Sequence, residues 1–211
     1  IASNYGKSYY PSDYSPNAGW ADYYGNEDFF KAYPNDDRKE WNYMTEWKIK
    51  SGEIIPYTES ADKLPAISKY YDYDEGAPGK SAQSNGITCI YRYAEVLLMY
   101  AEASTRATNS VNQDALNAIQ EVQKRAGYQD RQIELTTTTE PTAFLAAVSN
   151  ERGWEFFAEM KRWFELVRLE KVSEVRAETW NGSLFQSNNH YYFPIPYQQI
   201  RLTQWTNNAG Y

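Results

Sequence analysis

Three glutamates that share one helical face are the residues whose spacing most suggests chemistry. Glu151, Glu155 and Glu159 recur every four residues in a stretch with a helical pattern. Glycosidases place two carboxyl groups roughly 5–10 Å apart, which neighbours on a helix can match. Like charges at this spacing also repel by roughly 0.2–0.5 kcal/mol per pair, so cations are expected beside them. The candidates are arginines of this and earlier segments: Arg152, Arg162, Arg92 and Arg125. These arginines and the surrounding aromatic rings favour a structural ion network over an acid and base pair.

Aromatic residues form the second chemically suggestive group, at 17% of the chain with 20 Tyr and 7 Trp. A Tyr or Trp ring has an apolar face and a polar group, which suits a ligand that carries both C–H faces and hydroxyls, as sugars do. Large aromatic rings are more often buried, so most of them are expected to pack loops onto helices. Rings are dense among Gly, Asn, Ser and Pro near the start of the chain: Tyr5, Tyr9, Tyr10, Tyr14, Trp20, Tyr23, Tyr24, Phe29 and Phe30.

Four of these rings are the candidate ligand-binding residues: Tyr10, Tyr14, Trp20 and Tyr24. We expect some of them to expose their faces side by side, because ordering an irregular loop costs entropy that recognition would justify. Nearby polar side chains are candidates for bonding sugar hydroxyls: Asp13, Asn17, Asp22 and Asn26.

The remaining composition disfavours several other chemistries. A net charge of −7 argues against nucleic acid as a partner, because phosphate binding needs clustered Lys and Arg. His190 is the only histidine, which excludes metal sites built from several histidines. The acidic turn at 72–76 lacks the spacing of a calcium loop. No glycine-rich nucleotide motif occurs either. We expect no catalytic residue, no metal and no cofactor.

Two features of the chain concern its context. Cys89 is the only cysteine, so no internal disulfide forms, and it is most simply a small buried apolar residue. No run of about 18 apolar residues is present, so no segment is expected to span a membrane. The chain begins with Ile1 and not with Met, which predicts a fragment or a processed product.

Two amphipathic helices in tandem, at about 91–107 and 112–127, follow the loop-rich start. In the first, apolar residues recur at the spacing of one helical face: Tyr93, Val96, Leu97, Tyr100 and Ala101. The second repeats the pattern with Leu116, Ile119, Val122 and Ala126. Asn112 or Ser110 can cap the second helix and Gly127 can end it. The short connection predicts an antiparallel hairpin similar to one tetratricopeptide unit.

The rest of the chain predicts one more long element and extensive loops. Residues 140–171 have the pattern of a single long helix that Thr139 can cap, with Pro141 in its first turn. Residues 1–86 read as mostly irregular, with a short helix at 26–33 and a weak hairpin around Ser51 and Gly52. The predicted fold class is therefore all-α: a TPR-like helix pair and one long helix with extended irregular loops.

Three segments resemble the SusD/RagB family of Bacteroidetes outer-membrane nutrient-binding lipoproteins. Residues 92–103 read RYAEVLLMYAEA and, with the following helix, resemble the family closely. Residues 151–168 look like the family pattern E-R-x-x-E-[LF]-x-x-E-G-x-R-x-x-D-L-x-R, with Met160 in place of Gly and Glu165 in place of Asp. Residues 191–211 resemble the closing pattern Y-L-x-P-I-P, E-I and N-P-G-Y, with Ala209 in place of Pro. Residues 35–38 are similar to the family's D-x-R element.

The resemblance implies an identity for the chain as part of a larger protein. It implies that residues 1–211 are the C-terminal half of a SusD/RagB-like domain, with an aromatic loop region at 1–86, a helical core at 91–171 and a C-terminal docking segment at 172–211. It also implies a surface-exposed outer-membrane lipoprotein, anchored through a lipid on an N-terminal half that this chain lacks. Such a protein captures glycan or peptide for a SusC-like TonB-dependent transporter and is not an enzyme.

Two other functions remain open at this point. A glycan-active hydrolase would use the acidic residues of the long helix, and a protein–protein adaptor would use the TPR-like pair, although fold analogy alone does not establish function.

Two structural expectations follow from these patterns. The helix pair should pack against the long helix and bring Arg92 or Arg125 within ion-pair distance of the glutamate stripe. The segment 191–211 should be ordered and docked on the helices through Tyr191, Phe193, Ile195 and Ile200.

Overall fold

The computed structural model describes residues 8–15, 18–70, 89–172 and 192–208. The chain divides into two compact units, Ile1–Glu159 and Met160–Tyr211. The described residues are mostly helical, with a few short strands, which confirms the predicted all-α class. None of the described helices is long and apolar enough to cross a membrane.

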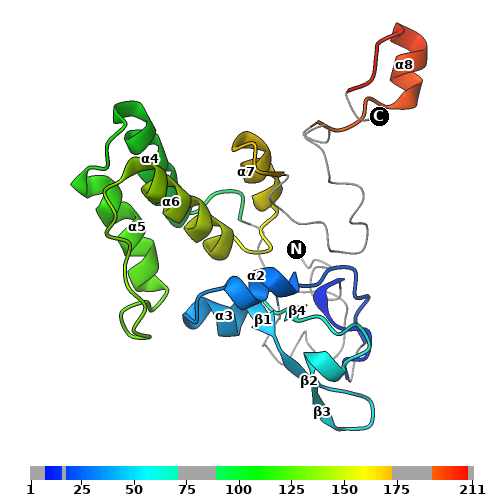
Figure 1. The fold of residues 1–211 in the computed structure, drawn as a ribbon. Helices are drawn as coiled ribbons and strands as arrows, with labels where there is room; N and C mark the ends of the chain where they lie inside the picture. Colours follow the sequence, from blue (N-terminus) through cyan, green and yellow to red (C-terminus); the bar gives the residue numbers. More distant parts are fainter. Residues whose placement is uncertain (1–7, 16–17, 71–88, 173–191, 209–211) are drawn as a thin grey trace. The chain divides into compact units, whose positions relative to one another are not determined.

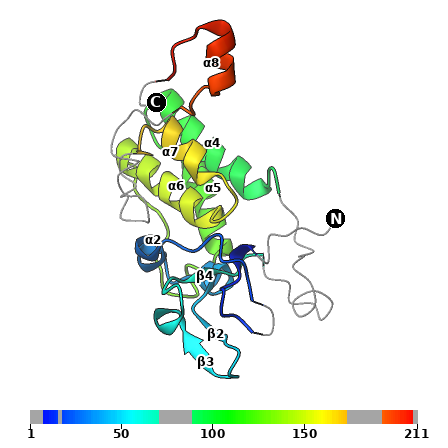
Figure 2. The same ribbon diagram turned by 90° about the vertical axis from the view of Figure 1, so that its right-hand side faces the viewer.

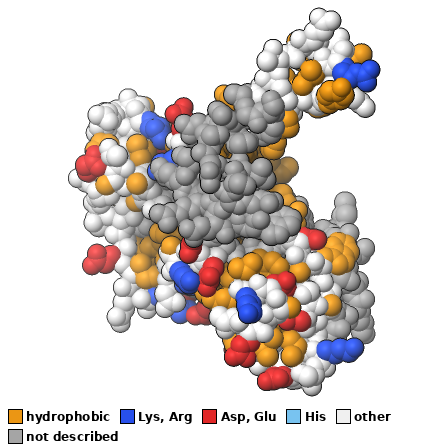
Figure 3. Space-filling view, turned by 45° about the vertical axis from the view of Figure 1, so that its right-hand side comes forward, with side chains coloured by type: hydrophobic (Ala, Val, Ile, Leu, Met, Phe, Trp, Pro, Cys, Tyr) orange, Lys and Arg blue, Asp and Glu red, His pale blue; other side chains and the backbone are white. Residues whose placement is uncertain are grey.

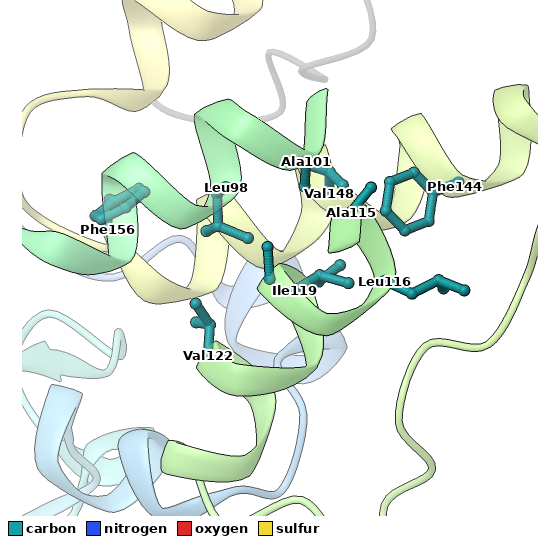
Figure 4. Close-up of a cluster of buried hydrophobic side chains, with 10 residues drawn as sticks. Leu98, Ala101, Ala115, Leu116, Ile119, Val122, Phe144, Val148 and Phe156 are labelled. Atoms are coloured by element: carbon teal, nitrogen blue, oxygen red, sulfur yellow. The ribbon is translucent and has the colours of Figure 1, made fainter. Parts of the chain in front are cut away.

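Three helices of the first unit lie side by side and enclose its main apolar core (Figures 1 and 2). They are α4 (Tyr93–Thr108), α5 (Gln113–Arg125) and α6 (Pro141–Glu155). Figure 4 shows side chains from all three helices pointing into one cluster, which contains Leu98, Ala101, Ala115, Leu116, Ala118, Ile119, Val122, Phe144, Val148 and Phe156. The predicted packing of the helix pair against the first part of the long helix is confirmed.

Local signals in the sequence explain where these helices begin and end. Asn112 caps α5, because its side-chain oxygen accepts the backbone N–H of Ala115 at 2.8 Å. Glu140, and not the predicted Thr139, caps α6 with its carboxylate, and Pro141 occupies the first turn. Asn109 ends α4 in the left-handed region with φ 47°.

The buried face of α4 differs from the predicted one. The sequence pattern indicated burial of Tyr93, Val96 and Tyr100, but these side chains are 65%, 52% and 45% exposed. Ala101 is buried and Leu97 is partly buried, as predicted, and Leu98, which lies outside the predicted face, is buried with them against α5 and α6. Helix α4 is therefore apolar on two faces, and periodicity alone cannot tell which face meets the core.

The predicted long helix at 140–171 is broken into two shorter helices. Helix α6 ends at Glu155, turns follow, and α7 (Arg162–Arg168) begins within the second unit. Ala158 and Met160 both have φ 59°, a left-handed conformation that ends a helix and favours glycine. The family pattern has Gly at position 160, and that Gly in the pattern was the available signal for this break, which Met160 itself does not provide.

A smaller part of the first unit carries the strands. Helices α2 (Glu27–Ala32) and α3 (Asp37–Asn42) precede β1 (Tyr43–Met44), β2 (Glu46–Lys48), β3 (Ile54–Pro56), a 3₁₀ turn (Tyr57–Glu59) and β4 (Ala66–Ile67). Strand β1 pairs antiparallel with β4, and β2 pairs antiparallel with β3, placing Trp47 opposite Ile55. The predicted short helix and hairpin are both confirmed, with Gly52 at φ 93° in the hairpin turn.

Aromatic rings join this part to the end of α6. Tyr43 packs on Phe157 at 4.5 Å between ring centroids and edge-on against Phe30 at 4.9 Å. The Tyr33 hydroxyl donates to the backbone carbonyl of Trp154 at 2.7 Å. These ring contacts fit the expectation that most rings near the start of the chain pack loops onto helices.

In Figure 3 the lower part of the surface mixes apolar side chains with charges of both signs.

The second unit contains α7 and α8 (Tyr197–Thr203). Within this unit Phe193 is 71% exposed, and Ile195 and Ile200 are partly covered, so the docking of the segment on the helix pair stays a prediction. A tilted contact between the Trp163 and Phe193 rings, 6.5 Å apart, is too little to bury the latter. Tyr191, His190 and the acidic turn at 72–76 lie outside the described residues.

Candidate functional site

Residues 8–15 and 18–25 belong to one loop whose two sides are joined by backbone hydrogen bonds. The carbonyl of Ser8 accepts the N–H groups of Asp22 and Tyr23 at 3.0 and 3.2 Å. The carbonyls of Tyr10 and Pro11 accept the N–H groups of Ala21 and Gly19 in the same way. The described residues of the loop are therefore held in a compact arrangement in spite of their irregular backbone.

A close backbone approach within this loop requires glycine. A Cβ atom placed on Gly19 would lie 1.8 Å from the carbonyl oxygen of Tyr10, far inside van der Waals contact. The Gly19 N–H donates to Pro11 at 2.8 Å at the same place. Only a residue without a side chain permits this approach, which holds the two sides of the loop together next to the loop tip, residues 12–15 and 18.

The loop tip is attached to the turn of the β2–β3 hairpin. Tyr14 forms an isolated antiparallel bridge with Ile49, and the Ser15 N–H donates to the Lys48 carbonyl at 2.8 Å. Two segments about 35 residues apart in sequence thus meet at one surface.

Two aspartates fix the underside of this arrangement. Asp13 accepts the indole N–H of Trp47 at 2.7 Å and the backbone N–H of Ala61 at 3.0 Å. Asp62 accepts the Ser12 hydroxyl at 3.0 Å and the Tyr24 hydroxyl. Burial and the neighbouring Asp62 raise the pKa of the Tyr24 phenol well above its ordinary value, so it remains a proton donor. Side chains that come from separate loops are therefore held in place before any ligand arrives.

A cleft of about 510 Å³ opens where the loop tip meets the hairpin turn. It is lined by an aromatic ring, an aliphatic side chain, hydroxyls and one cation; we call it the loop cleft, and its residues are Ser12, Asp13, Tyr14, Ser15, Ala18, Ile49, Lys50 and Ser51. A volume of this size accommodates a small organic ligand. The mixture of an apolar face with several hydroxyl groups suits a ligand that has both kinds of surface.

The four predicted ligand-binding rings differ in exposure and in their position relative to the loop cleft. Tyr14 lines the loop cleft. Tyr10 is 7% exposed and packs against Tyr14 in a tilted contact, with ring centroids 5.1 Å apart, so it offers no open ring face. Trp20 is 50% exposed but is not part of the cleft wall, and Tyr24 is partly buried with its hydroxyl on Asp62. The structure brings two of the four, Tyr10 and Tyr14, into ring contact.

The predicted hydroxyl-bonding residues also have varied positions. Asp13 lines the cleft, but its two oxygens accept protein N–H groups. Asn26 caps α2 by accepting the Phe29 N–H, and Asp22 is exposed. Asn17 lies outside the described residues. Sequence reasoning missed Ile49, Lys50 and Ser51; the turn signal at 51–52 predicted a hairpin, but nothing local indicated that this turn meets the aromatic loop.

The glutamate stripe forms the predicted ion network within the first unit. Glu155 accepts from Arg92, and from Arg125 Nη2 at 2.7 Å, which confirms the expected ion pairs. Glu159 accepts from Arg92 Nη2 at 2.8 Å and from Lys69 at 2.6 Å. The stripe faces basic side chains on other segments, and its like charges are thereby compensated.

Arg38 is the centre of this network, a role that the sequence did not reveal. Its Nη1 donates to Glu151 at 2.6 Å and to Glu155 at 2.8 Å, and its Nε donates to Asp36 at 3.0 Å. The guanidinium is 8% exposed, and Asp36 and Glu151 are completely buried. The D-x-R element of the sequence was the available signal, because the planar guanidinium can bond several carboxylates at once.

The protonation of these glutamates argues against acid catalysis. Burial opposes ionisation of Glu155, but Arg92, Arg125 and Arg38 hold its pKa below the ordinary value. The pKa of Glu159 is lowered against burial by Arg92 and Lys69. Burial raises the pKa of Glu151, which is closed to solvent. Glu155 and Glu159 border a second cleft of about 530 Å³, but as ionised acceptors neither can protonate a leaving group there.

Arg152 and Cys89 also depart from the predictions. Arg152 forms an ion pair at 3.6 Å with Glu95 on α4, a carboxylate outside the stripe. Cys89 is exposed at the edge of the second cleft and is not the buried apolar residue that the sequence suggested. Within the described ranges no cluster of three or more His, Cys, Asp or Glu could hold a metal ion.

Comparisons with known proteins agree on one family. The sequence profile of the SusD family matches residues 4–211. SusD-like protein P2 of Formosa agariphila is 29% identical over 202 residues, which are 86% of this chain and 39% of that protein.

Two solved structures share the fold of this chain at 22% sequence identity. A SusD superfamily protein from Parabacteroides distasonis has a TM-score of 0.77, covering 100% of this chain and 47% of its own. Surface glycan-binding protein A from Bacteroides uniformis has a TM-score of 0.69, covering 99% and 47%. The chain thus spans less than half the length of each of these relatives.

Proposed function

Because this chain belongs to the SusD family, we propose that it forms part of a cell-surface protein that binds glycan nutrients without chemically altering them. In this proposal the loop cleft holds a sugar ring. The protein passes its ligand to a SusC-like TonB-dependent transporter in the outer membrane, and a lipid on another part of the natural-length protein provides the anchor.

The composition and rigidity of the loop cleft carry the proposal. Tyr14 provides a ring against which the C–H face of a pyranose can stack. Ser12, Ser15, Ser51 and Lys50 provide hydroxyl and ammonium groups for the sugar hydroxyls. The loop is fixed by Asp13 and by the bridge to Ile49, so little conformational entropy is lost on binding.

Two further observations support binding without catalysis. Surface glycan-binding protein A from Bacteroides uniformis, which shares the fold, binds glycan by its name. The glutamates that a hydrolase would need form ion pairs with basic side chains instead, namely Arg38, Arg92, Arg125 and Lys69. An adaptor function for the TPR-like pair has no comparable support in the site.

The proposal is tested on the natural-length protein with a panel of immobilised soluble polysaccharides, followed by calorimetry on the polysaccharide that binds. Tyr14→Ala should weaken binding roughly three- to tenfold, as expected for the loss of one aromatic contact. Trp20→Ala tests whether the exposed indole of Trp20, in the same loop but outside the cleft wall, also contacts the glycan.

Trp41→Ala is the matched control, because Trp41 is a similarly exposed tryptophan at 63% but lies on α3, away from the loop cleft. All variants should retain the melting temperature of the parent protein. Unchanged affinity in Tyr14→Ala, together with equal effects of Trp20→Ala and Trp41→Ala, would move the glycan site out of this loop.

A further inference from the structure

The loop cleft contains one positive and one negative side chain, and the protein bonds only the negative one. The Asp13 carboxylate accepts the indole N–H of Trp47 at 2.7 Å on one oxygen and the backbone N–H of Ala61 at 3.0 Å on the other. Lys50 is exposed in the wall of the cleft, and within the described residues its ammonium group forms no hydrogen bond and no ion pair. The carboxylate is therefore occupied by neutral donors, and the ammonium group is open to a ligand.

Most other cations of the first unit have an acidic partner. The described arginines of this unit all form ion pairs, namely Arg38, Arg92, Arg106, Arg125, Arg131 and Arg152. Lys48, at the end of β2, has no ion-pair partner within the described part of the chain, as is the case for Lys50. The end of the β2–β3 hairpin, labelled in Figure 1, therefore presents two positive charges that no described carboxylate pairs with.

Hydroxyl groups divide the loop cleft into a donor side and an acceptor side. The Ser51 oxygen accepts the backbone N–H of Glu53 at 3.4 Å, so its own proton can still be donated. The Ser12 hydroxyl donates to Asp62 at 3.0 Å and therefore meets a ligand as an acceptor. The hairpin turn thus provides an ammonium group and a hydroxyl donor, which are the groups that bind an anion.

The chemistry of Lys50 favours an acidic sugar over a neutral one. A ligand that enters the cleft removes water from the ammonium group, and this loss is unfavourable unless an opposite charge replaces the water. A carboxylate or a sulfate ester provides that charge, and hydrogen bonds between charged groups are stronger than neutral ones. An equatorial substituent projects from the edge of a pyranose ring. The ring face can therefore lie on Tyr14 while the anionic group reaches the hairpin turn.

The negative charge of the whole chain does not prevent this selectivity. Its net charge of −7 repels an anion at long range. At physiological ionic strength, however, charges are largely screened beyond about 8 Å. The groups next to the ligand therefore determine its preferred charge, and the one carboxylate in the cleft wall already accepts two N–H groups.

We infer, on the basis of the proposed function, that the glycan held in the loop cleft is acidic and has a carboxylate or a sulfate ester at the edge of its pyranose ring. The anionic group lies at the turn of the β2–β3 hairpin, where the Lys50 ammonium group and the Ser51 hydroxyl bind it. Lys50 is then the residue that selects acidic glycans over neutral ones, whereas the Tyr14 ring contacts both kinds.

Calorimetry on the natural-length protein with matched polysaccharides tests the inference. The acidic members of the panel, among them polygalacturonic acid and κ-carrageenan, are each compared with the neutral polymer obtained by carboxyl reduction or by desulfation. The two kinds of pair separate a carboxylate from a sulfate ester as the recognised group. In at least one pair the acidic member should bind about three- to tenfold more tightly, as expected for one exposed ion pair. Raising NaCl from about 50 mM to about 500 mM should reduce this preference.

Substitution of single lysines assigns the preference to the cleft. Lys50→Gln should lower the affinity for the acidic polymer about three- to tenfold and affect the neutral polymer less, so that the preference disappears. Lys50→Arg should retain the preference, because it keeps the charge. Lys48→Gln is the matched control, since it removes the same charge from the same hairpin but lies outside the cleft wall. It should retain most of the preference.

Three results would contradict the inference. Equal affinity for both members of every pair would show that the charge of the glycan is not recognised, and a preference that survives in Lys50→Gln would show that another group recognises it. If only neutral polysaccharides bind and Tyr14→Ala weakens them, the glycan site stands and its assignment to acidic glycans is wrong. Binding of no polysaccharide at all would overturn the proposed function itself, and this inference with it.

Discussion

Arg38→Ala should be among the most destabilising single substitutions in this chain. The side chain that it removes donates to Asp36, Glu151 and Glu155, and all three carboxylates are buried. Glu155 retains Arg92 and Arg125, but Glu151 and Asp36 lose their only ion-pair partner among the described residues.

The expected cost follows from the uncompensated charges that the substitution leaves behind. Removing one partner of a buried ion pair costs roughly 3–5 kcal/mol, because the remaining charge stays desolvated. A typical domain is stable by only about 5–15 kcal/mol, so the variant should unfold at much lower denaturant concentration or fail to accumulate. Arg38→Lys should recover part of the lost free energy of unfolding, because it restores a positive charge. The recovery should be incomplete, because an ammonium group lacks the planar fork with which Arg38 bonds several carboxylates.

The assay is urea unfolding of the natural-length protein, followed by circular dichroism, with an arginine of different environment as control. Arg131 also has two acidic partners, Asp37 and Glu40, but its ion pairs are solvent-exposed. Arg131→Ala should therefore change the free energy of unfolding little. A midpoint for Arg38→Ala equal to that of Arg131→Ala would refute the argument that the buried network stabilises the fold.

Three further outcomes are expected. Tyr43→Phe should raise the free energy of unfolding by about 1 kcal/mol, because the Tyr43 hydroxyl is buried without a hydrogen-bond partner among the described residues; a lower melting temperature in calorimetry would contradict this. Gly19→Ala should destabilise by about 1–3 kcal/mol and reduce glycan affinity, because its Cβ collides with the Tyr10 carbonyl; an unchanged melting curve would show that the loop adapts. Stability should fall as pH drops below the ordinary glutamate pKa, since Glu155 and Glu159 have lowered pKa values in the folded protein and lose their ion pairs on protonation. Urea midpoints at pH 7 and pH 4 measure this, and Glu159→Gln should reduce the difference between them.

Local sequence signals predicted the helices well where capping and apolar spacing agreed. Asn112 begins α5, and the signal at Ser51 and Gly52 produces a hairpin turn. The predicted ion pairs of Arg92 and Arg125 also form, because a glutamate stripe on one helix requires cations from its neighbours.

The differences arise where tertiary contacts choose between equally good local patterns. Helix α4 has two apolar faces, and the prediction included Tyr93 and Tyr100, which are exposed, beside Ala101, which is buried, and it left out Leu98 of the core. The break between α6 and α7 depends on the left-handed backbone at Met160. A methionine in the sequence does not indicate that conformation, because it favours glycine.

The candidate site was predictable only in part, for the same physical reason. Aromatic density identified the loop, but not that Tyr10 would be buried under Tyr14. The contribution of Ile49 and Lys50 depends on a contact between segments about 35 residues apart. No local property of either segment encodes that contact.

A crystal structure of the natural-length protein with a bound oligosaccharide from the polysaccharide panel tests the central claim most directly. A pyranose ring should lie against Tyr14, between the loop tip at 12–15 and 18 and the hairpin turn at 49–51, with its hydroxyls near Lys50 and the serine side chains. A sugar bound at full occupancy elsewhere, with the loop cleft empty, would contradict the assignment of this cleft as the glycan site.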